Sequence, residues 1–555
     1  MPGAFGVVDH GQGPAARAPV VVRDVSGKGV HPETRDDRAA WRAAWRAKLA
    51  EVLATPASSY ADSARRLSAL VRTEMLRFED LVESPAKFFE AHRLLARAGF
   101  DQGPGFSIRF TVQYNLFAGT VLELGGPAHV RQLKRMQRDG TLGCFALTER
   151  LAGVNSGLVV HTTAAWVPNA KQKDGGRFLL RTPDDGATKN WISQGLVAAK
   201  AVVVADLLVD DTSFGPHAFL VTLRDTRGRV AKGVTLTDMG GKTTGNDLDN
   251  AGIAFDDVWL ARDALLDKHC DVFSVSDSSS SEGTPTLRGV YVERESVSET
   301  PETHTPRTHT RRLTNMDRVG QRLFTGRVAV AQGAHEFRER LFRRAREATD
   351  AKPCWVPGDA GNTRSLSDVP QLRSLYVEEA RRSARTRAFL EAVEAALCAS
   401  LAARRRPERA LVEAVAAAKV RAVDEAIEMT HRLRQEVGSY ALMAGTGFEH
   451  TDFLQCCKFA EGDSRVLMMK MARDRVGALV KKNRGAGGGE TAASIFASRR
   501  EAEAAAALAE ALKAAASRGS SPVEAWDEVS ESAYALAAIA IEEIVQKWLE
   551  PRAKL

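Results

Sequence analysis

The chain has 555 residues, of which 44% are apolar and 26% are charged, and its formal net charge is +7. This length is too great for one compact core, so we expect two or three structural units of an ordinary soluble globular protein. No run of about 18 uncharged apolar residues occurs, which argues against a membrane span. The basic excess is mild, and no basic stripe with interleaved aromatic residues is present, so nothing favours binding to nucleic acid.

The first part of the chain divides into an irregular start and a helical domain. We expect residues 1–30 to be disordered. They lack the apolar segment of a secretory signal, and a mitochondrial presequence stays an open alternative although its amphipathic periodicity is weak. From Arg35 onward apolar residues recur at helical spacing, as at Trp41, Trp45 and Leu49. Residues 31–142 are therefore predicted to form an N-terminal helical domain.

The pattern changes at Gly143. Short strand-like segments follow, separated by turn residues such as Gly175-Gly176 and Gly240-Gly241. Residues 143–273 are therefore predicted to form a middle β-domain, either a barrel or a sandwich. Residues 274–312 are rich in Ser, Thr, Glu and Arg without apolar periodicity, so we expect a disordered low-complexity insertion there.

The remainder of the chain is predicted to be helical. Long amphipathic stretches fill residues 313–484 and predict a C-terminal four-helix bundle. A glycine-rich linker then leads to further C-terminal helices within residues 485–555. The predicted fold class is thus α+β with several domains: an N-terminal helical domain, a middle β-domain, and a helix bundle with extra C-terminal helices.

Six cysteines are present, and no two of them form a Cys-x-x-Cys pair. The adjacent Cys456 and Cys457 are poorly spaced for binding one zinc ion together with a neighbouring histidine. We therefore expect free thiols in a reducing compartment and no metal site.

A short segment late in the predicted bundle carries the strongest candidate for chemistry. Glu461 stands directly before Gly462, and the following Asp463-Ser464 pair can cap a helix by accepting hydrogen bonds from its first N–H groups. Gly462 would let a ligand approach the backbone closely. Taken alone, the segment fits a solvated glutamate at a helix start better, because acidic residues favour the positive end of the helix dipole.

Further motifs precede and surround this segment: Phe110 to Leu116, Gly143 to Glu149, Pro183 to Lys189, Trp191-Ile192-Ser193, His217-Ala218-Phe219, Asp249-Asn250, Gly326-Arg327-Val328 and Phe459 to Met469. In this order and architecture they resemble the acyl-CoA oxidase and acyl-CoA dehydrogenase superfamily, with a closer match to the oxidases. The resemblance implies an FAD cofactor bound between β-domain and bundle, and a fatty acyl-CoA thioester as substrate.

The same resemblance implies roles for individual residues. Glu461 would be the catalytic base that removes the α-proton of the thioester while the β-hydrogen leaves as a hydride to the flavin. Its backbone N–H would polarise the thioester carbonyl. The remaining implied site residues are Thr148, Trp191 and Ser193 at the flavin ring, Gly462, Asp463 and Ser464 near its adenosine part, Arg346 at its pyrophosphate, and Asn155 and Ser156 at the substrate. As alternatives, Thr148 would be an ordinary strand residue and Trp191 a core aromatic.

Three departures from the family pattern stand out. Val154 replaces the serine that helps to hold substrate, and the glycine-rich turn of the bundle reads Ala444-Gly445-Thr446-Gly447-Phe448. The arginine-rich segment that reaches the pyrophosphate is reduced to Arg346 and Lys352, and a lysine cannot copy the bidentate contact of an arginine. These changes put the affinity for FAD in doubt.

We therefore predict an FAD-dependent acyl-CoA oxidase that forms a trans-2-enoyl-CoA, passes its electrons to oxygen and assembles as a homodimer. Ala553-Lys554-Leu555 is a conservative variant of the Ser-Lys-Leu tripeptide that the peroxisomal import receptor reads, which predicts a peroxisome or a related organelle such as the glycosome. Two alternatives are an acyl-CoA dehydrogenase that passes electrons to a carrier protein, and a catalytically weakened acyl-CoA-binding or scaffold paralogue.

Overall fold

The structure is a computed structural model, and it describes residues 35–153, 160–277, 286–294, 323–483 and 496–550. The chain divides into two compact units, residues 1–48 and 49–555. Most of helix α1 (Arg35–Val52) belongs to the first unit, and on it the rings of Trp41 and Trp45 stack with their centroids 5.9 Å apart. Residues 1–30, which we predicted to be disordered, lie outside the described part.

The second unit begins with a helical domain. Its elements are α2 (Tyr60–Arg72), α3 (Asp80–Glu83), α4 (Pro85–Ala98), the 3₁₀ turn η1 (Phe100–Gln102), α5 (Gly105–Thr111), η2 (Val112–Ala118), α6 (Gly119–Leu124) and α7 (Pro127–Asp139). Ser59 caps α2 by accepting a hydrogen bond from the backbone N–H of Asp62. Pro127 occupies the first turn of α7, where a missing N–H breaks no helical bond, and Gly140 ends that helix in a left-handed conformation with φ of 66°.

Helices α5, η2 and α6 form one continuous run, and its middle part, η2, is a π-helix. Phe110 and Phe117 of this run are fully buried, which fixes the run in the domain core. Two polar residues of η2, Gln113 and Asn115, are fully buried as well. π-Helical turns are rare in proteins, and those that occur are often at functional sites. Buried polar side chains are normally hydrogen-bonded, so the partners of Gln113 and Asn115 indicate what this turn does.

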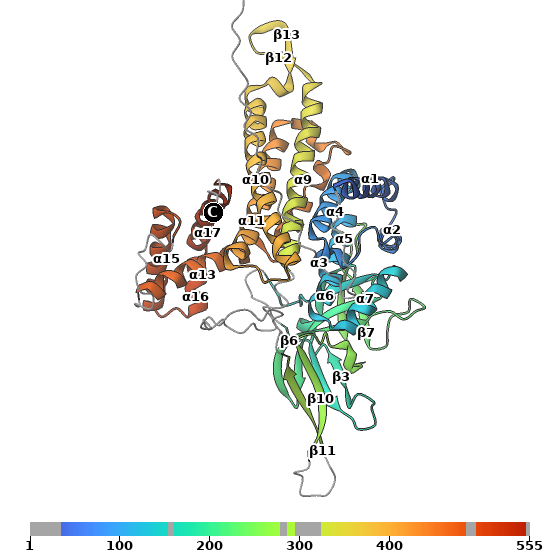
Figure 1. Cartoon of the computed structure of the whole chain (residues 1–555). Coiled ribbons are helices and arrows are strands. Elements are labelled where there is room, and N and C mark those ends of the chain that lie inside the picture. Colours follow the sequence, from blue (N-terminus) through green and yellow to red (C-terminus); the bar gives the residue numbers. More distant parts are fainter. Residues whose placement is uncertain (1–34, 154–159, 278–285, 295–322, 484–495, 551–555) are drawn as a thin grey trace, which may run out of the picture. The chain divides into compact units, whose positions relative to one another are not determined.

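The middle domain, coloured cyan to green in Figure 1, is built from two sheets. Its strands are β1 (Gly143–Ala146), β2 (Thr163–Pro168), β3 (Gly176–Arg181), β4 (Lys189–Ser193), β5 (Lys200–Val209), β6 (Thr212–Thr222), β7 (Val234–Asp238), β8 (Asn250–Phe255) and β9 (Val258–Leu260). The larger sheet has the order β1-β5-β2-β3-β9, with β6 also paired with β5, and the smaller sheet has the order β4-β8-β7. Strand β5 is parallel to β1 and β2 and antiparallel to β6.

The two sheets share one apolar core. Phe178 and Phe219 of the larger sheet and Ile192 and Ile253 of the smaller sheet belong to the same cluster of buried side chains. Strands β5, β6 and β8 contribute nearly continuous runs of buried residues to this core, as expected for strands covered on both faces, whereas β2 alternates between buried and partly exposed residues. The predicted middle β-domain is confirmed.

One sequence prediction is wrong in this region. Strands β10 (Cys270–Asp277) and β11 (Thr286–Glu293) form an antiparallel hairpin that begins in the predicted β-domain and extends into the stretch that we predicted to be a disordered insertion, residues 274–312. Within this stretch Tyr291, which lies between Val290 and Val292 on β11, packs against the ring of Phe214 with centroids 4.3 Å apart. The abundance of serine concealed these apolar side chains, while residues 278–285 and 295–312 lie outside the described part.

Three long helices form the centre of the C-terminal domain: α9 (Leu323–Asp350), α10 (Pro370–Ala402) and α11 (Arg409–Glu436). They run side by side in Figure 1 and share an apolar core that contains Phe337, Leu375 and Met429. Arg338 is also fully buried between them, and ion pairs to Glu379 (2.7 Å) and Glu425 (3.1 Å) compensate its charge. The predicted helix bundle is confirmed.

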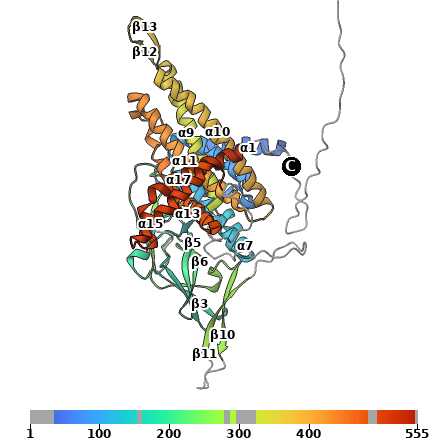
Figure 2. The ribbon, with the colours of Figure 1, turned by 90° about the vertical axis from the view of Figure 1, so that its left-hand side faces the viewer.

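Shorter elements complete the C-terminal part. The strands β12 (Pro353–Val356) and β13 (Asp359–Ser365) form a hairpin between α9 and α10, and the further helices are α12 (Phe453–Phe459), α13 (Ser464–Asn483), α15 (Arg499–Ser517), α16 (Pro522–Glu528) and α17 (Ser530–Leu549). Figure 2 shows α13, α15 and α17 grouped together, and their shared core includes Val476, Leu508 and Leu536. Helices α13 and α17 also pack against α11. The predicted α+β fold with extra C-terminal helices is therefore confirmed.

All six cysteines lie in the described part of the chain, and no disulfide links them. Among the described residues no group of three or more His, Cys, Asp or Glu side chains could hold a metal ion. None of the described helices combines the length and apolarity that are needed to cross a bilayer.

A buried ion pair joins the helical domain to the β-domain. Arg109 of α5 and Asp249, which precedes β8, are both fully buried at the side chain and lie 2.8 Å apart. The Arg109 guanidinium also donates to the carbonyl of Asp247 at 3.0 Å, and the second oxygen of Asp249 accepts from the backbone N–H of Leu196 at 2.7 Å. Removal of one partner would leave the other charge buried without compensation.

We expect Arg109→Met to lower the free energy of unfolding by about 3–5 kcal/mol, because it strands the carboxylate of Asp249 in the interior. Chemical denaturation followed by circular dichroism measures this change. The double variant Arg109→Met/Asp249→Leu removes both charges and should recover part of the loss. A single variant as stable as the parent protein would contradict the assignment.

Candidate active site

The segment from Phe459 to Ser464 forms a tight turn between α12 and α13. Glu461 and Gly462 both adopt left-handed backbone conformations, with φ of 57° and 95°. The conformation is natural for a glycine but strained for a glutamate. Asp463 accepts a hydrogen bond from the backbone N–H of Arg465 at 2.7 Å, so it caps α13 as the sequence predicted. The turn therefore directs the Glu461 side chain inward, and only 8% of this residue is exposed.

The Glu461 carboxylate lies against the π-helix η2. The side-chain amide of Asn115 donates to Glu461 Oε1 at 3.1 Å, and Asn115 Oδ1 accepts from the hydroxyl of Thr325 at 2.6 Å. Because Thr325 occupies the oxygen of the amide, the NH₂ group is the one that faces Glu461. The solvated helix-start glutamate that the local sequence favoured is thus excluded.

Gly326 of α9 leaves the space in which the carboxylate stands. A Cβ atom at this position would lie 2.1 Å from Glu461 Cδ and 2.2 Å from its Oε1. No side chain fits at such distances, so the absence of one at Gly326 is a condition for the observed position of Glu461.

Arg327, the next residue of α9, binds the backbone of the turn. Its Nε donates to the carbonyl oxygen of Glu461 at 2.9 Å. Burial lowers the pKa of Arg327 to about 10, and the opposite charge of Glu461 works against this fall. The guanidinium is therefore held as a cation beside the turn at neutral pH.

Two residues predicted to contact the adenosine part of the flavin lie on the inner side of the turn. The carbonyl of Gly462 and the hydroxyl of Ser464 accept hydrogen bonds from Lys419 Nζ at 2.9 and 3.1 Å. Ser464 is completely buried. In this structure both residues thus bind α11, and their contact with a cofactor stays a prediction.

The three residues predicted at the flavin ring lie at one edge of the β-domain. The backbone N–H of Asn190 donates to the carbonyl of Thr148 at 2.8 Å, which places the end of β1 beside β4. The side chain of Thr148 is exposed, Ser193 accepts from the side-chain amide of Asn250 at 3.1 Å, and Trp191 is 54% exposed with φ of 58°. Trp191 is therefore not the core aromatic of the alternative interpretation.

A buried ion pair supports this edge from behind. Lys189 Nζ lies 2.8 Å from Glu149 Oε1 and donates also to the carbonyl of Val204 at 2.7 Å. Burial lowers the pKa of Lys189 to about 8 against the opposing charge of Glu149. Burial alone would raise the pKa of Glu149, but Lys189 and the backbone N–H groups of His161 and Thr162 hold it below its usual value. The ion pair thus fixes Glu149, which directly follows Thr148, and Lys189, which lies two residues before Trp191.

The π-helix η2 connects this edge to the Glu461 turn. Gln113 Oε1 accepts from the backbone N–H of Gly143 at 2.8 Å and from the side-chain amide of Gln194 at 2.9 Å. Gln194 directly follows Ser193, and Asn115, which binds Glu461, is two residues from Gln113. The structure therefore joins the predicted base and the predicted flavin-ring residues through one helical segment.

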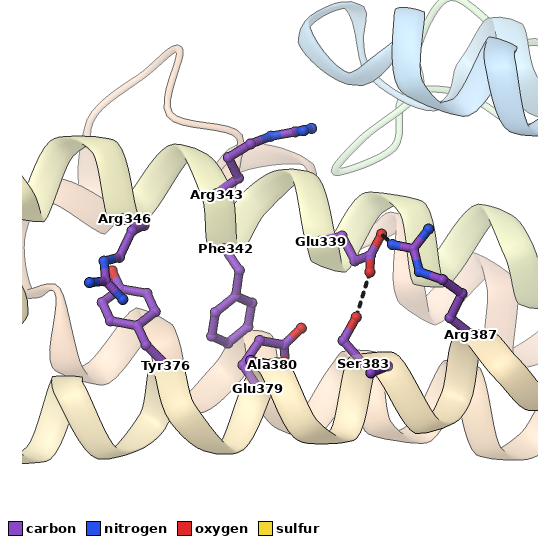
Figure 3. A pocket seen from close by; sticks show the side chains of 10 residues that line it. Glu339, Phe342, Arg343, Arg346, Tyr376, Glu379, Ala380, Ser383 and Arg387 are labelled. Carbon is purple, nitrogen blue, oxygen red and sulfur yellow. Dashed lines mark hydrogen bonds and ion pairs between the residues drawn. The ribbon is translucent and has the colours of Figure 1, made fainter. Parts of the chain in front are cut away.

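Arg346 is placed elsewhere. It lies on α9, 19 residues beyond Arg327, which is about 28 Å along a helix axis. Its guanidinium stacks on the ring of Tyr376 at 4.8 Å and pairs with Asp350 at 3.0 Å. Figure 3 shows it at one end of an open hollow of about 410 Å³ between α9 and α10. Within this chain Arg346 and Glu461 are not brought together.

The two residues predicted to hold substrate, Asn155 and Ser156, lie outside the described residues, as do Val154 and the C-terminal tripeptide. Their roles stay predictions.

Sequence reasoning missed several residues that the structure brings to Glu461. Asn115, Gly326 and Arg327 stand inside motifs that carried the resemblance, but no role was derived for them. The one available signal for Asn115 was its place, with Gln113, in an otherwise apolar helical run. Lys419 had no such signal, because it stands in a helix whose exposed face also carries charged residues.

No family model matches the sequence. Segments of the chain are nevertheless similar to curated proteins. The peroxisomal acyl-coenzyme A oxidase 2 of Arabidopsis thaliana is 33% identical over 251 residues, which are 42% of this chain and 34% of that protein. The human peroxisomal acyl-coenzyme A oxidase 3 is 30% identical over 210 residues, which are 37% of this chain and 29% of that protein. The chain thus spans about a third of the length of the curated relatives that it matches.

Solved structures extend the similarity to nearly the whole chain. Acyl-CoA oxidase 1 of Yarrowia lipolytica superposes with a TM-score of 0.66 at 17% identity, covering 93% of this chain and 76% of that one. Acyl-CoA oxidase 2 of Caenorhabditis elegans, solved with FAD, ascaroside-CoA and ATP, gives a TM-score of 0.67 at 18% identity, covering 92% and 78%. The chain therefore has the acyl-CoA oxidase fold, and the predicted resemblance to the acyl-CoA oxidase and dehydrogenase superfamily is confirmed.

Proposed function

We propose that the protein is an FAD-dependent acyl-CoA oxidase that converts a fatty acyl-CoA into its trans-2-enoyl-CoA and passes the electrons to oxygen. The observation that carries the proposal is the buried carboxylate of Glu461, held by Asn115 in a space that Gly326 leaves open. The names of the related proteins support the choice of acyl-CoA as substrate and of oxygen as acceptor.

Glu461 is the base in this proposal. Its carboxylate removes the proton from the α-carbon of the thioester, and Asn115 orients it by donating to Oε1. The backbone N–H of Glu461 donates to the thioester carbonyl, where negative charge develops as the proton leaves. The carboxylate and the backbone N–H belong to one short turn. The turn therefore fixes the distance and orientation between the group that accepts the proton and the group that donates to the thioester carbonyl.

The residues at the edge of the β-domain fit a flavin. Trp191 is about half exposed, Ser193 follows it on the same strand, and the exposed Thr148 lies on the neighbouring segment, whose carbonyl accepts from Asn190. A strained backbone at Trp191 is the kind of feature that persists at binding sites. When bound, FAD would supply the acceptor for the hydride from the β-carbon. Gly462 and Ser464 would hold its adenosine part, and Asn155 and Ser156 would hold the substrate.

We propose a homodimer and a peroxisomal location for the same protein. The word peroxisomal in the names of two relatives supports the location, and Ala553-Lys554-Leu555 would be the segment read by the import receptor. Arg346 lies far along α9 from Arg327. A contact between Arg346 and a flavin beside Glu461 would therefore be made by the arginine of a second copy.

The first experiment records the absorbance spectrum of the purified protein before and after anaerobic addition of a long-chain acyl-CoA. A flavin band that bleaches on addition supports the reaction, and rapid recovery in air distinguishes an oxidase from a dehydrogenase. A colourless protein that takes up no FAD would contradict both enzymes and favour the scaffold paralogue.

We expect Glu461→Gln to retain flavin and acyl-CoA but to lower turnover by about 10²–10⁴-fold, because the base is lost while the shape is kept. Hydrogen peroxide production measures turnover. Glu436→Gln, at an exposed position at the end of α11, is the control and should match the parent protein. Turnover that persists in Glu461→Gln would refute the assignment of the base.

We expect Gly326→Ala to lower turnover by about 10²-fold, because the new methyl group occupies the place of the Glu461 carboxylate and displaces the base by an ångström or more. The matched control is Gly333→Ala on the same helix, where the nearest atom to a new Cβ, of Phe453, is 3.7 Å away. Equal activity of the two variants would contradict the geometry of the site.

A further inference from the structure

Lys419 of α11 is completely buried directly behind the Glu461 turn. Its ammonium donates to the carbonyl of Lys458 at 2.5 Å, to the carbonyl of Gly462 at 2.9 Å and to the hydroxyl of Ser464 at 3.1 Å. An ammonium has three N–H donors. All three are used, and their acceptors lie on both sides of Glu461 in the sequence.

The strained backbone of the Glu461 turn needs hydrogen bonds from other helices to hold it. A glutamate with φ of 57° costs free energy and persists only when the surrounding structure over-determines it. Lys419 holds the residues before and after Glu461 from α11, while Arg327 holds the carbonyl of Glu461 itself from α9 at 2.9 Å. Two cations from two helices thus fix the turn before Glu461, at Glu461 and after it.

The bonding of Lys419 differs from that of three other buried cations, which lie away from the Glu461 turn. Lys189, Arg109 and Arg338 each face a carboxylate, which compensates their burial. The hydrogen bonds of Lys419 go to two carbonyls and a hydroxyl. Burial accordingly lowers its pKa to about 8, although Cys457, Asp463 and Asp424 work in the opposite direction. An apolar side chain would fill this core position at less cost to stability, so packing alone does not account for a lysine.

We propose that Lys419 is a positioning residue for catalysis, which sets the place of the Glu461 carboxylate by tying both ends of its turn to α11. The inference rests on the proposed function in one respect, namely that this carboxylate is the base. The physical claim about the turn is independent of that function and is tested separately.

The test of the physical claim is hydrogen exchange in the purified full-length protein carrying Lys419→Met, a substitution of similar length without the donors. Amides in the peptide covering residues 458–467 should exchange about tenfold faster or more, because charged hydrogen bonds that hold the turn are lost. Lys470→Met is the matched control, since that lysine is exposed and pairs with Asp474. Unchanged exchange in Lys419→Met would overturn the proposal.

Ser464→Ala provides a milder variant in case Lys419→Met does not fold. It removes one of the three acceptors, and exchange in the same peptide should rise about three- to tenfold. If Lys419→Met and Ser464→Ala, or whichever of them folds, leave amide exchange in residues 458–467 unchanged, the turn does not depend on Lys419 and the proposal fails.

The catalytic claim is tested by separating binding from turnover. Lys419→Met should lower kcat about 10²-fold, as expected for a displaced base, while the Kd of a non-reactive thioether analogue of acyl-CoA stays within about threefold of that of the parent protein. A purely structural role would change both quantities together or neither, and either result overturns the catalytic claim. A parent protein that does not oxidise acyl-CoA would refute the proposed function, while the exchange experiment would still decide whether Lys419 holds the turn.

Discussion

A buried carboxylate on a left-handed turn is the constraint on which the candidate site depends. Nothing in the sequence between Phe459 and Ser464 would keep Glu461 at φ of 57° by itself. The conformation is held by groups from three separate helices: the amide of Asn115, the guanidinium of Arg327 and the ammonium of Lys419. The site therefore exists only in the folded bundle, with η2 docked against it.

The π-helix explains how two domains meet at this turn. Residues two apart on a helix do not face the same way. Gln113 accordingly binds Gly143 and Gln194 of the β-domain, whereas Asn115 binds Glu461. Arg109, one turn earlier, fixes the same run to Asp249. One helical segment thus sets the distance between the edge that carries Trp191 and the turn that carries the carboxylate.

The sequence predicted the domain order well, because helical and strand periodicities are local properties of the chain. It also singled out Glu461, since the Glu-Gly-Asp-Ser segment resembles a known family motif. It did not predict the β10–β11 hairpin, because serine-rich composition outweighed the apolar alternation around Val290 and Val292. Nor did it assign Lys419, since burial of one lysine in a charged helix depends on tertiary packing that no local pattern records.

Buried charge is used in two different ways in this protein. Arg109 and Lys189 each pair with one carboxylate and Arg338 pairs with two, so the charge of each cation is compensated and the pairs hold elements together. At the Glu461 turn, Lys419 and Arg327 instead donate to backbone carbonyls. Such bonds fix the backbone, and with it the N–H of Glu461 that would meet the substrate carbonyl. In the proposed reaction the thioester carbonyl would accept from the N–H of Glu461, so these positive charges would stand near the oxygen that gains negative charge and would act without reorganisation. In the proposed function the same two side chains would therefore combine positioning of the turn with electrostatic support.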